Sequence, residues 1–129
     1  MAVLSGVIRV MEKAARKAGG RLRRDFGEVE HLQVSHKGPA DFVSKADRIA
    51  ERTIYDELLA ARPEWGFVME EAGVIEGDEN KPRWIADPLD GTSNFLHGIP
   101  HFAISIAVQE PKLGGGGWGD VTAAVIYNP

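Results

Sequence analysis

The sequence predicts an α+β domain in which two N-terminal helices pack on a largely antiparallel, layered sheet. Apolar residues in the first half of the chain recur at steps of three and four, as they do in amphipathic helices. Shorter apolar runs follow, and several of them end in turn-forming dipeptides, which is typical of strands. The length of 129 residues limits the chain to one ordinary domain.

The first helix is expected near the N-terminus and should stop by Gly27. Val29–Ser35 then alternates weakly, which indicates a short strand or an extended loop, and Lys37–Asp41 has the composition of a turn. The apolar face of the helix consists of Leu4, Val7, Ile8, Met11, Ala14, Ala15, Ala18 and Leu22.

A second helix is expected to open at Ser44, because Ser44 and Asp47 are spaced nearly as in a capping box. Asp47 would then lie in the first turn, where the helix dipole favours an anion, so capping alone explains it. Arg62-Pro63 ends the helix. Its inward face comprises Ala46, Ile49, Ala50, Ile54, Leu58 and Ala61.

Four apolar runs predict strands, at Trp65–Met69, Trp84–Ala86, Phe102–Gln109 and Val121–Tyr127. Phe102–Gln109 alternates large and small apolar residues, as expected for a strand covered on both faces. The Gly-rich segment from Pro111 to Gly119 should join it to Val121–Tyr127 as an antiparallel hairpin. This segment lacks the Lys-Ser/Thr ending of a phosphate-binding P-loop, which argues against a nucleotide site.

Carboxylates follow two of these strands. Glu70-Glu71 comes directly after one, and Asp87-Pro-Leu-Asp90 comes directly after another, so the two groups should converge. Asp87, Asp90 and the Leu89 carbonyl are hard oxygen donors that suit Mg²⁺, Mn²⁺ or Ca²⁺. The amides of Gly91, Thr92 and Ser93 are placed to face an anion. On these residues alone, an ordinary surface turn and a solvated Glu pair are the favoured interpretation.

Composition excludes several other classes. The net charge is −4 with both signs interspersed, so no basic face for nucleic acid is evident. There is no cysteine, which rules out disulfides and thiolate metal ligands. No apolar run approaches membrane-spanning length and the N-terminus lacks a signal-peptide pattern, so a cytoplasmic location is expected.

The stretch from Asp87 to Gly98 (DPLDGTSNFLHG), with Glu70-Glu71 upstream, resembles the signature of the inositol monophosphatase family, its bacterial suppressor-type members in particular. The segment from Lys37 to Asp47 resembles the family's early segment, and Ala124–Pro129 resembles its mid-chain strand. The resemblance covers essentially the whole chain, but only as the N-terminal half of the family.

This resemblance implies the sugar-phosphatase type of α/β sandwich and Mg²⁺-dependent hydrolysis of a small phosphate monoester, first of all inositol monophosphate, by direct attack of water. It implies that Glu70, Asp87 and the Leu89 carbonyl hold one ion and that Asp87 and Asp90 share a second. Asp47 and Thr92 would activate the water together with Glu70. Asp90, Gly91, Thr92 and Ser93 would bind the phosphorylated polyol. Glu71 and Lys37 would contact the metal-binding residues without binding the ions themselves.

The resemblance also implies two or three Mg²⁺ ions, tolerance of Mn²⁺, lithium sensitivity and a homodimer. No counterpart of the family's Trp-Asp-x-Ala-Ala-Gly segment occurs, so residues 1–129 are expected to be the metal-binding N-terminal domain of a longer enzyme, inactive alone. Three alternatives stay open: a nucleotide- or fructose-bisphosphate phosphatase, a regulatory protein associated with RNA polymerase and RNA processing, and an inactive half-domain.

Overall fold

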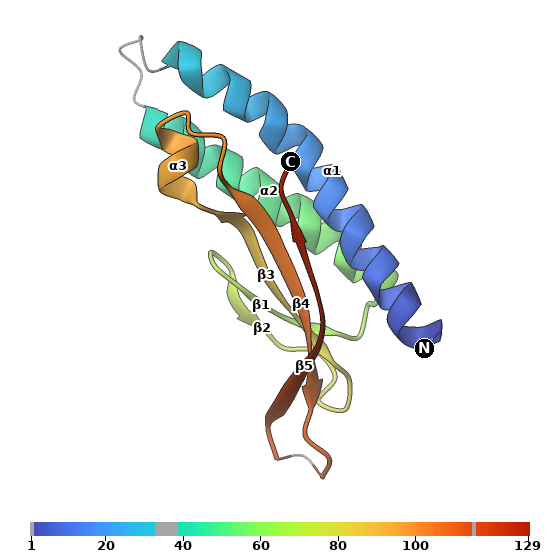
Figure 1. The fold of residues 1–129 in the computed structure, drawn as a ribbon. Helices are drawn as coiled ribbons and strands as arrows, with labels where there is room; N and C mark the ends of the chain where they lie inside the picture. Colours follow the sequence, from blue (N-terminus) through green and yellow to red (C-terminus); the bar gives the residue numbers. More distant parts are fainter. Residues whose placement is uncertain (1, 33–38, 115) are drawn as a thin grey trace.

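The computed structural model describes residues 2–32, 39–114 and 116–129, and it confirms the predicted fold class (Figure 1). Two long helices lie side by side against a five-stranded sheet. The elements in chain order are α1 (Ala2–Leu32), α2 (Pro39–Ala61), β1 (Gly66–Met69), β2 (Gly73–Ile75), β3 (Arg83–Asp90), α3 (Thr92–Leu96), β4 (Ala103–Pro111) and β5 (Trp118–Tyr127).

The sheet is mostly antiparallel, with strand order β2-β1-β3-β4-β5. Among the strands that the structure describes, β1 and the central strand β3 are the one parallel pair, in a register that places Met69 opposite Ala86. β4 and β5 form the predicted hairpin. The short strand β2 was not predicted; it pairs antiparallel with β1, with Met69 opposite Gly73.

The first helix is longer than predicted, because α1 continues through Gly27 to Leu32. Phe26 explains the extension: its ring packs against Phe95 at 5.6 Å and Phe102 at 5.2 Å between ring centroids. The prediction of a strand or extended loop at Val29–Ser35 is therefore wrong for residues 29–32, and residues 33–35 lie outside the described part of the chain.

The second helix begins at Pro39, earlier than the predicted start at Ser44. Ser44 is inside the helix and accepts a hydrogen bond from Arg48 Nη1 at 3.1 Å. Asp47 therefore lies well past the first turn, and the capping interpretation of Asp47 is wrong. Proline is favoured in the first turn of a helix, since its missing N–H is not needed there. The predicted end before Arg62-Pro63 is confirmed.

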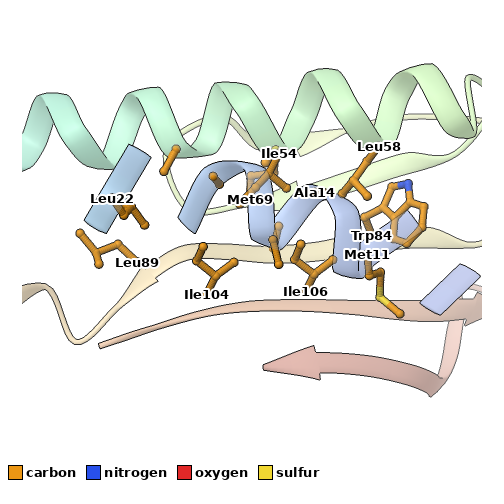
Figure 2. Packing of buried hydrophobic residues seen from close by; sticks show 14 of the residues in the cluster. Met11, Ala14, Leu22, Ile54, Leu58, Met69, Trp84, Leu89, Ile104 and Ile106 are labelled. Atoms are coloured by element: carbon orange, nitrogen blue, oxygen red, sulfur yellow. The ribbon is translucent and has the colours of Figure 1, made fainter. Parts of the chain in front are cut away.

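The hydrophobic core lies between the two helices and one face of the sheet (Figure 2). Met11 and Leu22 of α1 and Ile54 and Leu58 of α2 are fully buried, as their helical spacing predicts. They pack over Trp84 of β3 and Ile104 and Ile106 of β4. The large apolar side chains of this cluster that are fully buried each contribute roughly 1.5–3 kcal/mol by leaving water.

The prediction that the Phe102–Gln109 strand is covered on both faces is wrong for the described residues. Ile104, Ile106 and Val108 are buried beneath the helices, whereas Ser105 and Ala107 on the other face are only half-buried. The alternation of large and small residues reflects one packed face and one thinly covered face.

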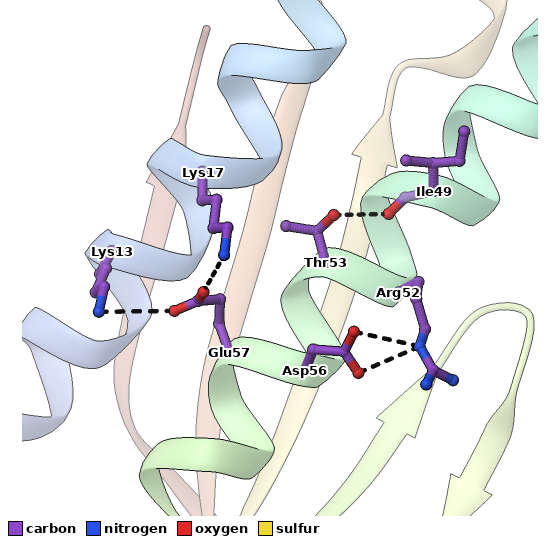
Figure 3. Close-up of polar contacts among 7 residues, drawn as sticks. All are labelled: Lys13, Lys17, Ile49, Arg52, Thr53, Asp56 and Glu57. Carbon is purple, nitrogen blue, oxygen red and sulfur yellow. Dashed lines mark hydrogen bonds and ion pairs between the residues drawn. The ribbon is translucent and has the colours of Figure 1, made fainter.

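Ion pairs join the two helices on their outer side. Glu57 of α2 accepts from Lys17 Nζ at 2.6 Å and lies 3.9 Å from Lys13 Nζ (Figure 3). α1 also approaches β5 closely, since a Cβ on Gly19 would lie 2.6 Å from a ring carbon of Tyr127. Close packing of α1 against β5 therefore requires glycine at this position.

Candidate active site

The carboxylates at the ends of β1 and β3 meet because these two strands are parallel. Met69 and Ala86 are the last pair of this ladder, so the residues that follow them, Glu70 and Asp87, lie side by side. Both strands end at the same edge of the sheet, where the first half of α2 crosses it (Figure 1). The expected convergence of the two carboxylate groups is thus a feature of the fold.

A cavity of about 380 Å³ lies between this edge, α2 and α3. Asp47 of α2 is buried there, with 6 % of its surface exposed. Glu70, Glu71 and Thr92 are exposed at its rim. Val43, Ser44 and Leu96 complete the lining. The structure therefore brings together four residues that the sequence placed in one site.

Asp47 is the most unusual group in this cavity. Its Oδ1 is buried and accepts no hydrogen bond from any residue that the structure describes. Burial raises the pKa of Asp47 to about 7, and the charges of Glu70, Glu71, Asp87 and Glu51 act in the same direction. The four side chains whose charges act on Asp47 in this way are all acidic, so they oppose its ionisation.

The carboxyl group of Glu70 is perturbed in the same sense. Partial burial raises its pKa, and the negative charge of Asp87 and a hydrogen bond shared with Asp87 raise it further. Glu71 and Glu51 add smaller contributions of the same sign. The described groups around the cavity thus form a set of mutually repelling carboxylates.

The turn after β3 differs from the simple strand end that was predicted. β3 runs on to Asp90, and the ladder to β4 shifts register between Asp87 and Asp90, as in a β-bulge. Pro88, which has no N–H to donate, lies inside this bulge. Asp87 Oδ1 accepts from the Leu89 N–H at 3.2 Å, which is the ordinary Asx turn considered as the alternative.

The bulge leads directly into the short helix α3. Gly91 precedes it with φ of 93°, a left-handed conformation that a side chain would resist. Thr92 Oγ1 donates to the Leu89 carbonyl at 3.0 Å. Because a carbonyl oxygen has two lone pairs, this bond leaves Leu89 one site for a cation. Ser93 is exposed in the first turn of α3.

Asp90 lies apart from the cavity that contains Asp47. It lines a second cavity of about 410 Å³ with Gly91, Asn94 and His101. Of the predicted substrate residues, Thr92 therefore lines the first cavity, while Asp90 and Gly91 line the second. Lys37, predicted to support the ligands, lies outside the described residues.

Sequence reasoning missed one functional candidate, Glu51. This side chain is buried, with 7 % exposed, and its two oxygens accept the N–H groups of Glu71 at 3.0 Å and Ala72 at 3.2 Å. The available signal was its spacing: Glu51 follows Asp47 by four residues, so both face the same way on a helix. An acidic residue on an otherwise apolar helix face was the clue.

The donor chemistry of the cavity fits a hard divalent cation, since the polar side chains that line it offer carboxylate and hydroxyl oxygens. In the part of the chain that the structure describes, no three His, Cys, Asp or Glu side chains are gathered closely enough to hold a metal ion. Carboxylates without a cation repel one another, so close coordination needs the ion itself. The orphaned Asp47 oxygen is the observation that favours one.

Comparison with known proteins gives a consistent result. Residues 3–129 match the inositol monophosphatase family. An inositol-1-monophosphatase from Mesorhizobium japonicum is 58 % identical over 97 % of this chain and 44 % of its own length. A protein named Nus factor SuhB from Escherichia coli is 37 % identical over 95 % of the chain and 43 % of its own length.

The fold comparison agrees with the sequence comparison. The crystal structure of the extragenic suppressor protein suhB from Bartonella henselae matches with a TM-score of 0.77 and 56 % identity, over 95 % of this chain and 45 % of that one. The chain therefore spans less than half the length of the relatives it matches. No helix in the described ranges is long and apolar enough to cross a membrane.

Proposed function

The chain belongs to the inositol monophosphatase family, and on that premise we propose that its acidic cavity serves Mg²⁺-dependent hydrolysis of a small phosphate monoester. One observation carries the proposal: Asp47 presents a buried, unpartnered oxygen among Glu70, Glu71 and Thr92. A buried carboxylate without a donor or counter-ion is costly, and a cation in the cavity would remove that cost.

Mg²⁺ would be held by Glu70, Asp87 and the Leu89 carbonyl, and a second ion by Asp87 and Asp90. When bound, Mg²⁺ neutralises phosphoryl and leaving-group oxygens. The Thr92 hydroxyl already donates its proton to Leu89, so its oxygen is free to accept a hydrogen bond from the attacking water.

Asp47 is the candidate base for that water. In the metal-free protein the pKa of Asp47 is raised to about 7 by burial and by neighbouring acids. A cation held by Glu70 and Asp87 would lower that pKa and favour the ionised form, which can accept a proton from water. The water would be oriented between Thr92 and Asp47, which line the same cavity. Gly91 and Ser93, with Asp90, remain the candidates for binding the phosphorylated polyol.

Inositol monophosphate is the substrate we favour, because the relatives at 58 % and 56 % identity carry the name inositol-1-monophosphatase. The family resemblance also supports a cytoplasmic homodimer that accepts Mn²⁺ and is inhibited by lithium. A regulatory binding role is the second candidate, and the relatives named Nus factor SuhB favour it. Capture of RNA polymerase by an Asp47→Asn variant would support that role independently of catalysis.

The test is phosphate release from inositol 1-phosphate, with Mg²⁺ or with EDTA, by the longer enzyme that is expected to contain residues 1–129, because these residues alone are expected to be inactive. We expect release only with Mg²⁺. Fructose 1,6-bisphosphate and a nucleoside bisphosphate serve as competing substrates, and release from one of these alone would reassign the substrate. Release that persists in EDTA, or no release from any of the three, would contradict the proposal.

A further inference from the structure

We infer that Glu51 is a positioning residue, which fixes the turn Glu70–Ala72 so that Glu70 faces the cavity. The inference rests on the function proposed for that cavity. Glu51 does not line the cavity beside Asp47; it lies one helical turn further along α2 and reaches the backbone of the turn instead.

The turn between β1 and β2 needs such a partner. The ladder between these strands ends at the pair Met69–Gly73, so the residues between them lie beyond the paired ends of the strands. Glu51 Oε1 accepts from Glu71 N–H and Oε2 accepts from Ala72 N–H. Hydrogen bonds to an ionised carboxylate are roughly twice as strong as neutral ones, and two parallel bonds also fix orientation.

This contact links the two sides of the proposed site. Glu70 immediately precedes the clamped amides, and the parallel pairing of β1 with β3 fixes it from the other side. Asp47 stands four residues before Glu51 on the same rigid helix. The separation of Asp47 from Glu70 therefore depends on a short bridge, from α2 through the Glu51 carboxylate to the turn.

Glu51 has two properties that an experiment must separate, its charge and its reach. Glu51→Gln keeps the length but removes the charge, and its amide nitrogen cannot accept the second N–H. Glu51→Asp keeps the charge but is one methylene shorter, so it cannot span both amides. Glu57→Gln is the matched control, because it makes the same change on α2 at an exposed pair with Lys17.

We would titrate the purified protein and the three variants with Mn²⁺ by calorimetry, and measure amide hydrogen exchange without metal. Both Glu51 variants should bind Mn²⁺ more weakly by about 10- to 100-fold, the usual effect of removing an outer partner of a ligand. Exchange at the Glu71 and Ala72 amides should become faster in both. Glu57→Gln should match the parent protein in both measurements.

Each other result decides against the inference. If only Glu51→Gln loses affinity, charge rather than position is responsible. If both Glu51 variants melt earlier but bind Mn²⁺ as the parent does, the role is structural alone. If the parent protein itself binds no Mn²⁺, the proposed function fails first and the inference fails with it, a result distinct from the other two.

Discussion

Two carboxylates on the same helix have opposite surroundings. Glu57, near the end of α2, lies between Lys13 and Lys17 of α1, and its pKa is lowered by the hydrogen bond and charge of Lys17 (Figure 3). Asp47, in the first half of α2, is surrounded by other acids, and its pKa is raised to about 7. Ten residues of one helix separate a compensated charge from an uncompensated one.

The difference shows that carboxylates on one helix can serve different purposes, Glu57 in helix packing and Asp47 in the proposed reaction. The Glu57 pair is exposed and salt-screened, so it holds the helices together only weakly. The Asp47 group costs stability unless a cation compensates it, and perturbed groups of this kind cluster at functional sites. We therefore expect changes at Asp47 to affect activity and metal response, and changes at Glu57 to affect neither.

The largest expected effect is on catalysis. Asp47→Asn should lower kcat for the phosphate monoester by about 10²- to 10⁴-fold, the usual value of a general base. Glu57→Gln, the same type of change at the compensated end of the helix, should leave kcat unchanged. Steady-state kinetics at saturating Mg²⁺ would measure both, and equal losses in the two variants would remove the distinction between the two regions.

The next effect is stabilisation by metal. Mg²⁺ that binds only the folded protein should add about 2.7 kcal/mol at a concentration 100 times its Kd. Thermal melts with Mg²⁺, and with KCl at equal ionic strength, would separate binding from screening of surface charge. An equal rise in Tm with both salts would mean that the acidic cavity has no specific affinity for the ion.

The third effect is the pH dependence of the metal-free protein. Because the pKa of Asp47 is raised from 3.8 to about 7, folding favours its protonated form. Its contribution is complete below about pH 4 and is lost as the pH rises towards about 7. Glu57 acts in reverse, since its lowered pKa gives stability that is lost in acid.

Urea unfolding in EDTA would measure this dependence. Asp47→Asn should reduce the loss of stability between about pH 5 and pH 7.5, compared with the parent protein. Part of the pH dependence of the unfolding free energy should remain in this variant, because the pKa of Glu70 is also raised. Identical slopes in the two proteins would show that Asp47 does not titrate in this window.

The smallest effect is expected at the helix pair itself. Lys17→Ala removes the 2.6 Å contact with Glu57, but Lys13 remains near the same carboxylate. Tm should change little, and less at high salt than at low salt, because exposed ion pairs are screened. A large loss of stability would show that this pair, too, has more than a surface role.

The sequence by itself determined most of the strands and the apolar faces of the two helices, except that Ile8, predicted on the apolar face of the first helix, is exposed. Residues such as Leu22, Ile54 and Ile106 are buried as their spacing predicts, because periodicity alone decides which side chains share a face. The sequence also located Glu70 directly after a strand, whereas Asp87, predicted to follow one, lies inside β3, which runs on to Asp90. Their roles as ligands stay predictions, as do those of Leu89, Asp90 and Ser93.

Only the tertiary structure decided which carboxylates are compensated. Helix limits depended on distant packing, as where Phe26 meets Phe95 and Phe102 beyond the predicted end at Gly27. Asp47 became a buried and unpartnered group, rather than a helix cap, because α2 begins at Pro39. The Glu51 carboxylate accepts a hydrogen bond from the backbone N–H of Glu71, twenty residues away in the sequence. Local sequence fixes backbone propensity, but the pKa and partners of a charge depend on whatever the fold brings beside it.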